Sequence, residues 1–384
     1  MLPVACYREP ETSNLLNPVM SFKPYIILFI AFMVLSSATN SSKIKLAGNA
    51  PLLFADEIPA SPYSEELEKV LLDRKAAQNV LGRSQQGRNI DAYFFPGTGD
   101  KRALVIGGMH GSELSSIEVA KELMRQLIQG DSIFYNVIII PSLFPDNAET
   151  AKQNFLQIGG VENIGRYSYP GAIDPNRQMP TPGHAFDEEN SLDHAGRKIE
   201  NENVLLLELI NQYRPQRIIN LHAIRNTGNA GVFADPRTDH KGIALGYATD
   251  SSLAIAMAAA IQQQGGYIPG NCLDKKPTAL YHKDPIAVAE GMFQKRNFTG
   301  SLIPGKRGGG VSLGTWASTA VYDEKDPFQN RDAIRIITME FPGSKRPVDH
   351  KKNLEAFYQQ QVVIYAKGIK SVFLGEYFTE EPGG

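Results

Sequence analysis

Short apolar runs alternate along this chain with longer segments in which apolar residues recur at helical spacing. We expect strands at the short runs, which are residues 90–95, 104–106, 137–140, 217–221 and 333–339. We expect helices where the spacing is helical, which are residues 65–80, 114–128, 203–213, 251–264 and 353–371. Strands that alternate with helices are typical of a largely parallel sheet, so the pattern predicts an α/β fold.

The amino-terminal part has the layout of a secretory signal peptide. Lys23 precedes the apolar run Tyr25–Leu35, and the small residues 36–38 follow it, with Ala38 as the expected cleavage point. The run holds eleven residues, which is short for a membrane span. We therefore predict that residues 1–38 are an N-terminal extension with a signal peptide, and that the protein is exported to a periplasmic or extracellular location. An uncleaved membrane anchor or a buried hydrophobic segment is the alternative.

Composition is that of an ordinary globular protein. The 384 residues are 42% hydrophobic with a formal net charge of −2, so the chain can bury a full core and shows no bias toward nucleic acid or anionic membranes. Residues 39–62 are small, polar and proline-bearing and predict a linker, which leaves residues 63–380 as one domain. Once Cys6 is lost with the signal, Cys272 has no partner for a disulfide.

The most informative stretch is residues 102–128, which predict a strand, a tight glycine turn and a helix. Ligands of open α/β sheets gather at the carboxyl ends of strands, and this turn carries His110 and Glu113. An imidazole and a carboxylate three residues apart can converge on one cation, while the glycines let the backbone bend tightly around it. The alternative is a polar turn that leads into a helix, with Ser112 as its N-cap.

The segment 141–200 is rich in Gly, Pro, Asn and Asp and is too long for a simple connection, which favours a functional loop. It contains Asn176 next to Arg177. A neutral amide beside a guanidinium fork is suited to binding a carboxylate, although an exposed Asn-Arg pair in a loop is commonplace.

Two more candidates stand at the ends of predicted strands. His222 ends the run 217–221, where its side chain can reach the ligand crevice, although a lone histidine there is more often a hydrogen-bonded core residue. Glu340 follows the run 333–339, and a carboxylate at the end of an apolar strand costs desolvation energy unless it has a partner or a task.

These four pieces, His110-x-x-Glu113, Asn176-Arg177, His222 and Glu340, resemble in order and setting the zinc carboxypeptidases of the carboxypeptidase A type. The resemblance runs from about Gln86 to Pro342. It implies a mixed, largely parallel twisted sheet flanked by helices on both faces, and one zinc ion per chain. It also implies roles for the residues: His110, Glu113 and His222 hold the zinc, Asn176 and Arg177 bind the substrate carboxylate, and Glu340 is the catalytic base.

General chemistry agrees with those roles. Two imidazoles and one carboxylate leave a fourth tetrahedral position for water, which distinguishes a catalytic zinc site from a structural one. A bound zinc lowers the pKa of that water toward neutrality and polarises the scissile carbonyl. A carboxylate within hydrogen-bond reach can take the proton from the water and pass it to the leaving amine.

The order of elements is also similar to the murein peptide amidase branch of the family. The segment 310–316 resembles the Gly-Ser-Trp segment of that branch, which implies that Trp316 helps shape the pocket for the released residue. The chain departs from the branch in the lengths between His222, Trp316 and Glu340. Arg166 is the nearest candidate for the family's second arginine, which helps polarise the carbonyl; the alternative is a solvated loop arginine.

Three functions follow as hypotheses. The first is an exported zinc peptidase that hydrolyses an amide next to a free carboxylate in a peptide or in a peptidoglycan-derived muropeptide. The second is a small-molecule deacylase of the aspartoacylase and succinylglutamate desuccinylase type, which has a similar layout. The third is a non-catalytic binding module, which the intact set of candidate residues disfavours. We expect neither nucleic acid nor nucleotide as a partner, and a membrane contact only through an uncleaved N-terminal segment.

Overall fold

The computed structural model describes residues 77–130, 132–245, 248–271, 273, 309–344 and 352–376. These residues all belong to one unit of the chain, Ile44–Gly384. The predicted signal peptide and linker, Cys272 and most of the helix predicted at 65–80 lie outside the described residues, so these stay predictions, as do the domain limits at 63 and 380. The described part of the chain contains no helix with the length and apolar character of a membrane span.

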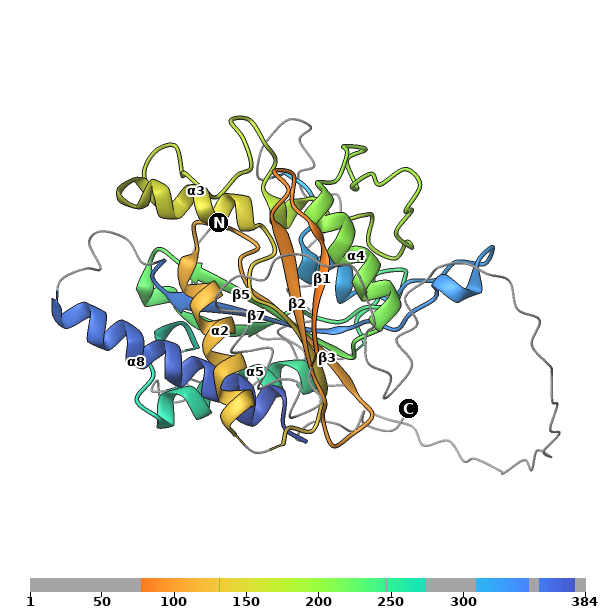
Figure 1. Ribbon diagram of the computed structural model, residues 1–384. Coiled ribbons are helices and arrows are strands. Elements are labelled where there is room, and N and C mark those ends of the chain that lie inside the picture. Colours follow the sequence, from red (N-terminus) through yellow and green to blue (C-terminus); the bar gives the residue numbers. More distant parts are fainter. Residues whose placement is uncertain are drawn as a thin grey trace, which may run out of the picture. The chain divides into compact units, whose positions relative to one another are not determined.

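The described residues form a mixed sheet of seven strands in the order β1-β2-β4-β3-β5-β7-β6 (Figure 1). The strands are β1 (Ala77–Arg83), β2 (Asn89–Phe95), β3 (Arg102–Ile106), β4 (Asn136–Ile140), β5 (Arg217–Ile224), β6 (Gly231–Ala234) and β7 (Arg335–Pro342). The central strands β4, β3, β5 and β7 are parallel, and antiparallel pairs extend the sheet through β2 and β1 at one edge and β6 at the other. The predicted mixed α/β sheet is confirmed, with parallel pairing confined to its centre.

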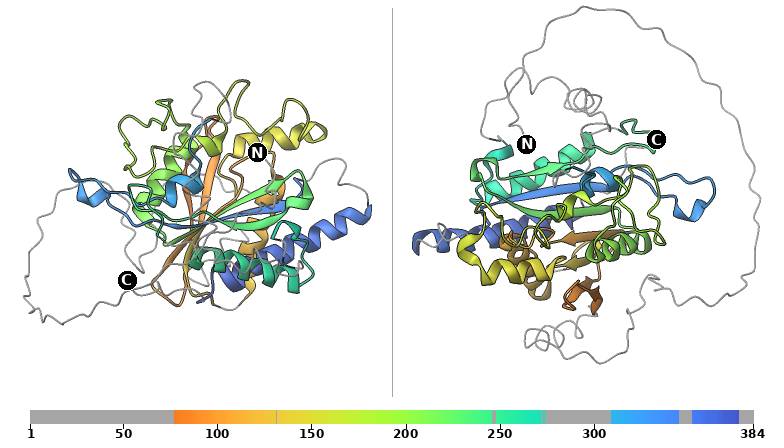
Figure 2. Two further views of the ribbon diagram at one scale, coloured as in Figure 1. Left: turned by 180° about the vertical axis from the view of Figure 1, so that it is seen from behind. Right: turned by 90° about the horizontal axis from the view of Figure 1, so that it is seen from above.

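Helices cover both faces of this sheet and bury two large hydrophobic cores and a small third cluster between α2 and α3. They are α2 (Leu114–Gln129), α3 (Pro145–Gln153), α4 (Asn201–Tyr213), α5 (Ala248–Gln263), α7 (Leu313–Ala317) and α8 (Lys352–Gly368). One core contains apolar residues of α2, α5 and α8, and the other contains those of α4 and α7. α2, α5 and α8 are grouped in Figure 1, and α4 lies apart from α5 and α8 in both views of Figure 2. The central strands are buried on both faces, which explains why they appear in the sequence as continuous apolar runs.

The helix predicted at 65–80 is wrong for residues 77–80, the part of it that the structure describes. Residues 77–83 form the edge strand β1, which pairs with β2 and has a register shift between Val80 and Gly82. Gly82 packs so closely on α4 that a Cβ atom there would come within 2.4 Å of the Leu205 side chain. Pairing with β2 and packing against α4 therefore make residues 77–83 a strand, although the apolar spacing of the sequence that leads into them is helical.

Three more differences concern the surroundings of the candidate site. The segment 141–200 contains a helix, α3, whose buried residues include Asp146 and Asn147, so it has little apolar signal. The short edge strand β6 was not predicted. β5 and β7 run two residues further than predicted beyond His222 and Glu340, so both side chains lie within the last residues of a strand.

Candidate metal centre

The turn between β3 and α2 is tight because two backbones pass close to it. Gly108 has φ +63°, a conformation that favours glycine, and a Cβ atom there would meet Ser142 Cα at 2.9 Å. At Gly111 a Cβ atom would meet the backbone nitrogen of Ala148 in α3 at 2.2 Å. The helix begins at Leu114 without a side-chain cap, so the N-cap role considered for Ser112 is wrong. The turn instead places His110 and Glu113 at the carboxyl end of β3.

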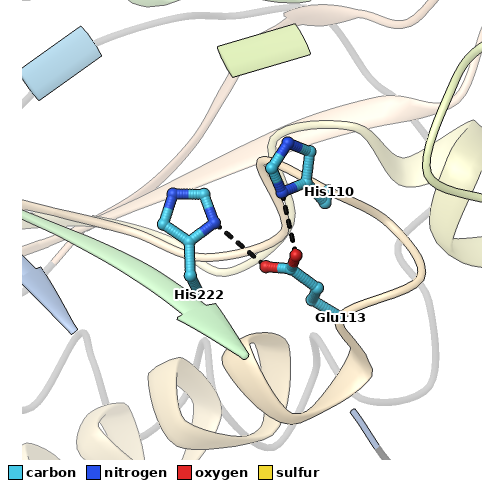
Figure 3. Close-up of side chains that lie close together, drawn as sticks. All are labelled: His110, Glu113 and His222. Carbon is cyan, nitrogen blue, oxygen red and sulfur yellow. Dashed lines mark hydrogen bonds and ion pairs between the residues drawn. The ribbon is translucent and has the colours of Figure 1, made fainter. Parts of the chain in front are cut away.

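His110, Glu113 and His222 converge into one buried cluster (Figure 3). Nδ1 of His110 lies 3.0 Å from Oε1 of Glu113, and Nδ1 of His222 lies 3.0 Å from Oε2 of the same carboxylate. One potential ligand atom from each residue lies within 4.8 Å of the others. His222 reaches the cluster because β5 is the parallel neighbour of β3. The three residues predicted as metal ligands are therefore brought together.

Asp174 supports the cluster from outside and was missed by the sequence interpretation. Its Oδ1 lies 2.8 Å from Nε2 of His110 and accepts the backbone N–H of Asn176 at 2.9 Å. A carboxylate on the outer ring nitrogen fixes the ring and directs the other nitrogen inward, which is the usual support of a metal-binding histidine. The signal was present in the sequence, since Asp174 stands two residues before the predicted Asn176-Arg177 pair.

The structure also brings Arg166 and Asn176 to the cluster. Nη1 of Arg166 donates to Oε1 of Glu113 at 2.7 Å and Nη2 to Oδ2 of Asp174 at 3.1 Å, so this arginine is not a solvated loop residue. Nδ2 of Asn176 lies 3.4 Å from Nε2 of His222, and Oδ1 accepts the backbone N–H of Leu313 at 3.0 Å. Arg177 follows in the same 3₁₀ turn, Pro175–Arg177, and is half-buried.

Glu340 stands beside His222 on the neighbouring strand. The two residues are partners in the parallel register of β5 and β7, so their side chains leave the sheet on the same face. The carboxylate of Glu340 is half-buried and makes no side-chain hydrogen bond to the part of the chain that the structure describes. Burial raises the pKa of Glu340. His222 lowers this pKa and Glu113 raises it, and the net shift is upward. Glu340 is therefore a stronger base than an exposed glutamate.

The charges of the cluster suit a bound cation. Burial would raise the pKa of Glu113, but His110 and His222 hold it well below its usual range, so the carboxylate is ionised. Burial lowers the pKa of His110, but Glu113 and Asp174 together raise it to about 9, so the metal-free cluster holds a proton there. Two nitrogen donors and one oxygen donor form a ligand set that zinc prefers, and a divalent cation would replace that proton. The residues present therefore fit the predicted zinc.

Trp316, predicted to help shape the substrate pocket, lies in the hydrophobic core. Its side chain is fully buried in the core next to α4, and the Arg331 guanidinium lies 4.4 Å from the centre of its ring. The ring therefore packs in the core, and its part in shaping the substrate pocket stays a prediction. The backbone of the same helix does touch the site, through the Leu313 N–H that Asn176 accepts.

Comparison with known proteins finds one family model that matches part of the chain. The model of the zinc carboxypeptidase family matches residues 73–241, which include the three predicted zinc ligands. No curated protein matches. Similar solved structures include carboxypeptidase A from Helicoverpa armigera, with 14% identity and a TM-score of 0.45 over 81% of this chain and 74% of that chain. A metallo-carboxypeptidase from Burkholderia cenocepacia has 13% identity and a TM-score of 0.40 over 81% of this chain and 69% of that chain.

A third similar structure is the murein-tripeptide amidase MpaA from Escherichia coli O157, with 16% identity and a TM-score of 0.37 over 74% of this chain and 92% of that chain. The family match and the converged ligand cluster agree with each other. Residues 73–241 therefore match the zinc carboxypeptidase family, and the ligand cluster fits the zinc-dependent peptidase that this match indicates.

Proposed function

We propose that this peptidase is exported and hydrolyses an amide bond next to a free carboxylate, with Glu340 as the general base. The observation that carries the proposal is the register of β5 and β7, which sets Glu340 beside the metal ligand His222. Asn176 also contacts His222, since its Nδ2 lies 3.4 Å from Nε2 of His222, and Arg177 is next along the chain. A candidate base and one residue of the candidate carboxylate-binding pair thus lie beside the same metal ligand.

Each residue has a separate task in the proposed reaction. A bound zinc would polarise the scissile carbonyl and lower the pKa of water at the site. Glu340 takes the proton from the attacking water and returns it to the leaving nitrogen. Arg166, already 2.7 Å from Glu113, is placed to donate a hydrogen bond to the carbonyl oxygen as negative charge develops on it. Asn176 and Arg177 hold the carboxylate of the residue to be released.

The carboxylate role of Arg177 predicts a selective binding defect. Arg177→Ala should raise KM for peptides with a free carboxylate by about ten- to a hundredfold, because charge-assisted hydrogen bonds are lost, and should change kcat much less. The same peptides with an amidated carboxyl terminus should respond little. Steady-state kinetics on both sets give the result. The control is Arg83→Ala, an exposed arginine whose Nη1 donates to Gly87 O in the first hairpin. An unchanged KM for the free acids would remove Arg177 from substrate binding.

Product analysis separates the substrate classes that the sequence left open. The zinc-loaded protein is incubated with muropeptides, with peptides that vary at the carboxyl terminus, and with acyl-amino acids, and the products are identified by mass spectrometry. Release of a residue or peptide from either of the first two pools supports the peptidase and names its specificity. Cleavage confined to the acyl-amino acids would support the deacylase hypothesis instead.

The proposed export rests on the layout of residues 20–38. Expressed with residues 1–38 in place in an export-competent host, the protein should be recovered outside the cytoplasm with its first residue near Thr39. Phe29→Arg places a charge in the middle of the apolar run and should keep the chain inside and uncleaved. Amino-terminal sequencing of both fractions gives the answer. An intact amino terminus in the cytosol of cells with the unmodified sequence would reject export.

A further inference from the structure

The segment that carries Asn176 and Arg177 lies outside regular strands and long helices, so its position depends on side-chain contacts. One contact is already part of the site, the Asp174 carboxylate that accepts the Asn176 N–H. A second contact comes from residues further along the same loop. Nη2 of Arg197 donates to the carbonyl oxygen of Arg177 at 3.2 Å and to that of Gly309 at 2.9 Å.

Arg197 is itself held rigidly by Asp193. Nε and Nη2 of Arg197 lie 2.7 and 2.6 Å from Oδ2 of Asp193. The other oxygen of Asp193 accepts the backbone N–H groups of Ala195 and Arg197 at 2.9 and 2.8 Å, and the side chain of Asp193 is 2% exposed. A buried carboxylate with all of these partners fixes the plane of the guanidinium. Arg197 can therefore hold a backbone in place.

The backbone that Arg197 contacts is closely packed. Gly310 has φ +139°, and a Cβ atom there would meet the carbonyl oxygen of Arg177 at 2.1 Å and Nη2 of Arg197 at 2.7 Å. One residue further along, Val311 accepts the backbone N–H of Met179 at 3.2 Å. Arg177 is thus enclosed between its own loop and the segment that leads into α7.

We propose that Arg197, oriented by Asp193, is a positioning residue that fixes where Arg177 presents its guanidinium to the carboxylate of the substrate. The inference rests on the proposed role of Arg177 in carboxylate binding. Arg197 acts through the carbonyl groups of Arg177 and Gly309 and does not touch the substrate.

The proposal predicts a change in discrimination as well as in activity. The measured quantity is the ratio of kcat/KM for a free-acid peptide to kcat/KM for the same peptide with an amidated carboxyl terminus. Arg197→Ala should lower this ratio by about tenfold through KM, the size expected for loss of one charge-assisted hydrogen bond, while zinc content by metal analysis stays full. A purely structural loss would reduce the active fraction for both peptides equally and leave the ratio unchanged.

Coupling with Arg177 sharpens the test. If Arg197 acts through Arg177, the ratio of the double variant Arg177→Ala, Arg197→Ala should equal that of Arg177→Ala alone. Arg125→Ala is the matched control, because Arg125 makes contacts of the same lengths, 2.7 and 2.6 Å, with Glu122 on the surface of α2. Its ratio should equal that of the unmodified protein. Asp193→Asn removes the charge that orients Arg197 and should also lower the ratio, by a smaller factor. If Arg197→Ala fails to fold, Asp193→Asn is the variant that tests the proposal.

The outcomes distinguish this proposal from the function on which it rests. An unchanged ratio in Arg197→Ala or, if that variant fails to fold, in Asp193→Asn, together with a collapsed ratio in Arg177→Ala, overturns the positioning role and leaves the proposed function intact. An unchanged ratio in Arg177→Ala overturns both. Additive losses in the double variant show that Arg197 acts independently of Arg177, which also overturns the positioning role.

Discussion

Glu340→Gln is expected to keep its zinc and its substrate affinity while kcat falls by about a hundred- to ten-thousandfold, the usual contribution of general-base catalysis. The amide is nearly the same size as the carboxylate, so the packing of β7 against β5 and β6 should survive. It cannot accept a proton from water, which is the one property that the proposed reaction needs at this position. The half-buried carboxylate has no hydrogen bond of its own within the described segments, so its replacement breaks no described contact.

Three measurements test this result together. Metal analysis gives the zinc content, competitive inhibition by a released product gives the affinity, and single-turnover kinetics give the chemical step. Glu355→Gln, which changes an exposed glutamate in the first turn of α8, is the control for the loss of one negative charge. If Glu340→Gln retained a near-normal kcat, Glu340 would be a structural carboxylate and the reaction would need another base.

The sequence predicted the parts of the site that depend on the ends of strands. His110 and Glu113 follow an apolar run and a glycine turn, and His222 and Glu340 close two further runs. In a sheet with a parallel centre these ends lie at one edge, so residues far apart in the chain are expected to meet there. The contact of His222 and Glu113, separated by 109 residues in the sequence, bears this out for the predicted ligand cluster.

The sequence could not predict parts of the site that depend on loop geometry. Arg166 and Asp174 lie in a segment without apolar periodicity, where no local pattern gives the direction of a side chain, and their contacts with Glu113 and His110 appear only in three dimensions. The burial of Trp316 in the core could not be predicted either, because a short sequence resemblance does not tell whether a ring faces the pocket or the core.

The same physical limit explains the missed elements of the fold. α3 buries polar side chains, among them Asp146, which accepts hydrogen bonds from Ser84 and the Gln86 backbone, so its sequence looks like that of a loop. β6 has four residues and is held as a strand by its antiparallel partner β7. Tertiary contacts decide such short or polar elements, and local propensity carries little information about them.

His222→Ala is expected to abolish stoichiometric zinc binding while the sheet still folds. The substitution removes one of three ligands, and the backbone of β5 keeps its pairing with β3 on one side and β7 on the other. The loss of zinc affinity should exceed the roughly ten- to hundredfold loss that follows removal of a carboxylate that supports a ligand from outside. Asp174→Asn removes such a carboxylate and leaves all three ligands in place, so its zinc affinity should lie between those of the unmodified protein and His222→Ala. His240→Ala, a histidine that stacks on Tyr322 outside the cluster, should bind zinc normally.

Competition with a chromophoric chelator gives the zinc affinity of the four proteins, and circular dichroism confirms that each is folded. The graded order matters more than any single value, because unfolding would reduce binding in His222→Ala and Asp174→Asn without regard to their distance from the metal. Full zinc occupancy in folded His222→Ala would show that the ion is held elsewhere, and the ligand set of His110, Glu113 and His222 would then be wrong.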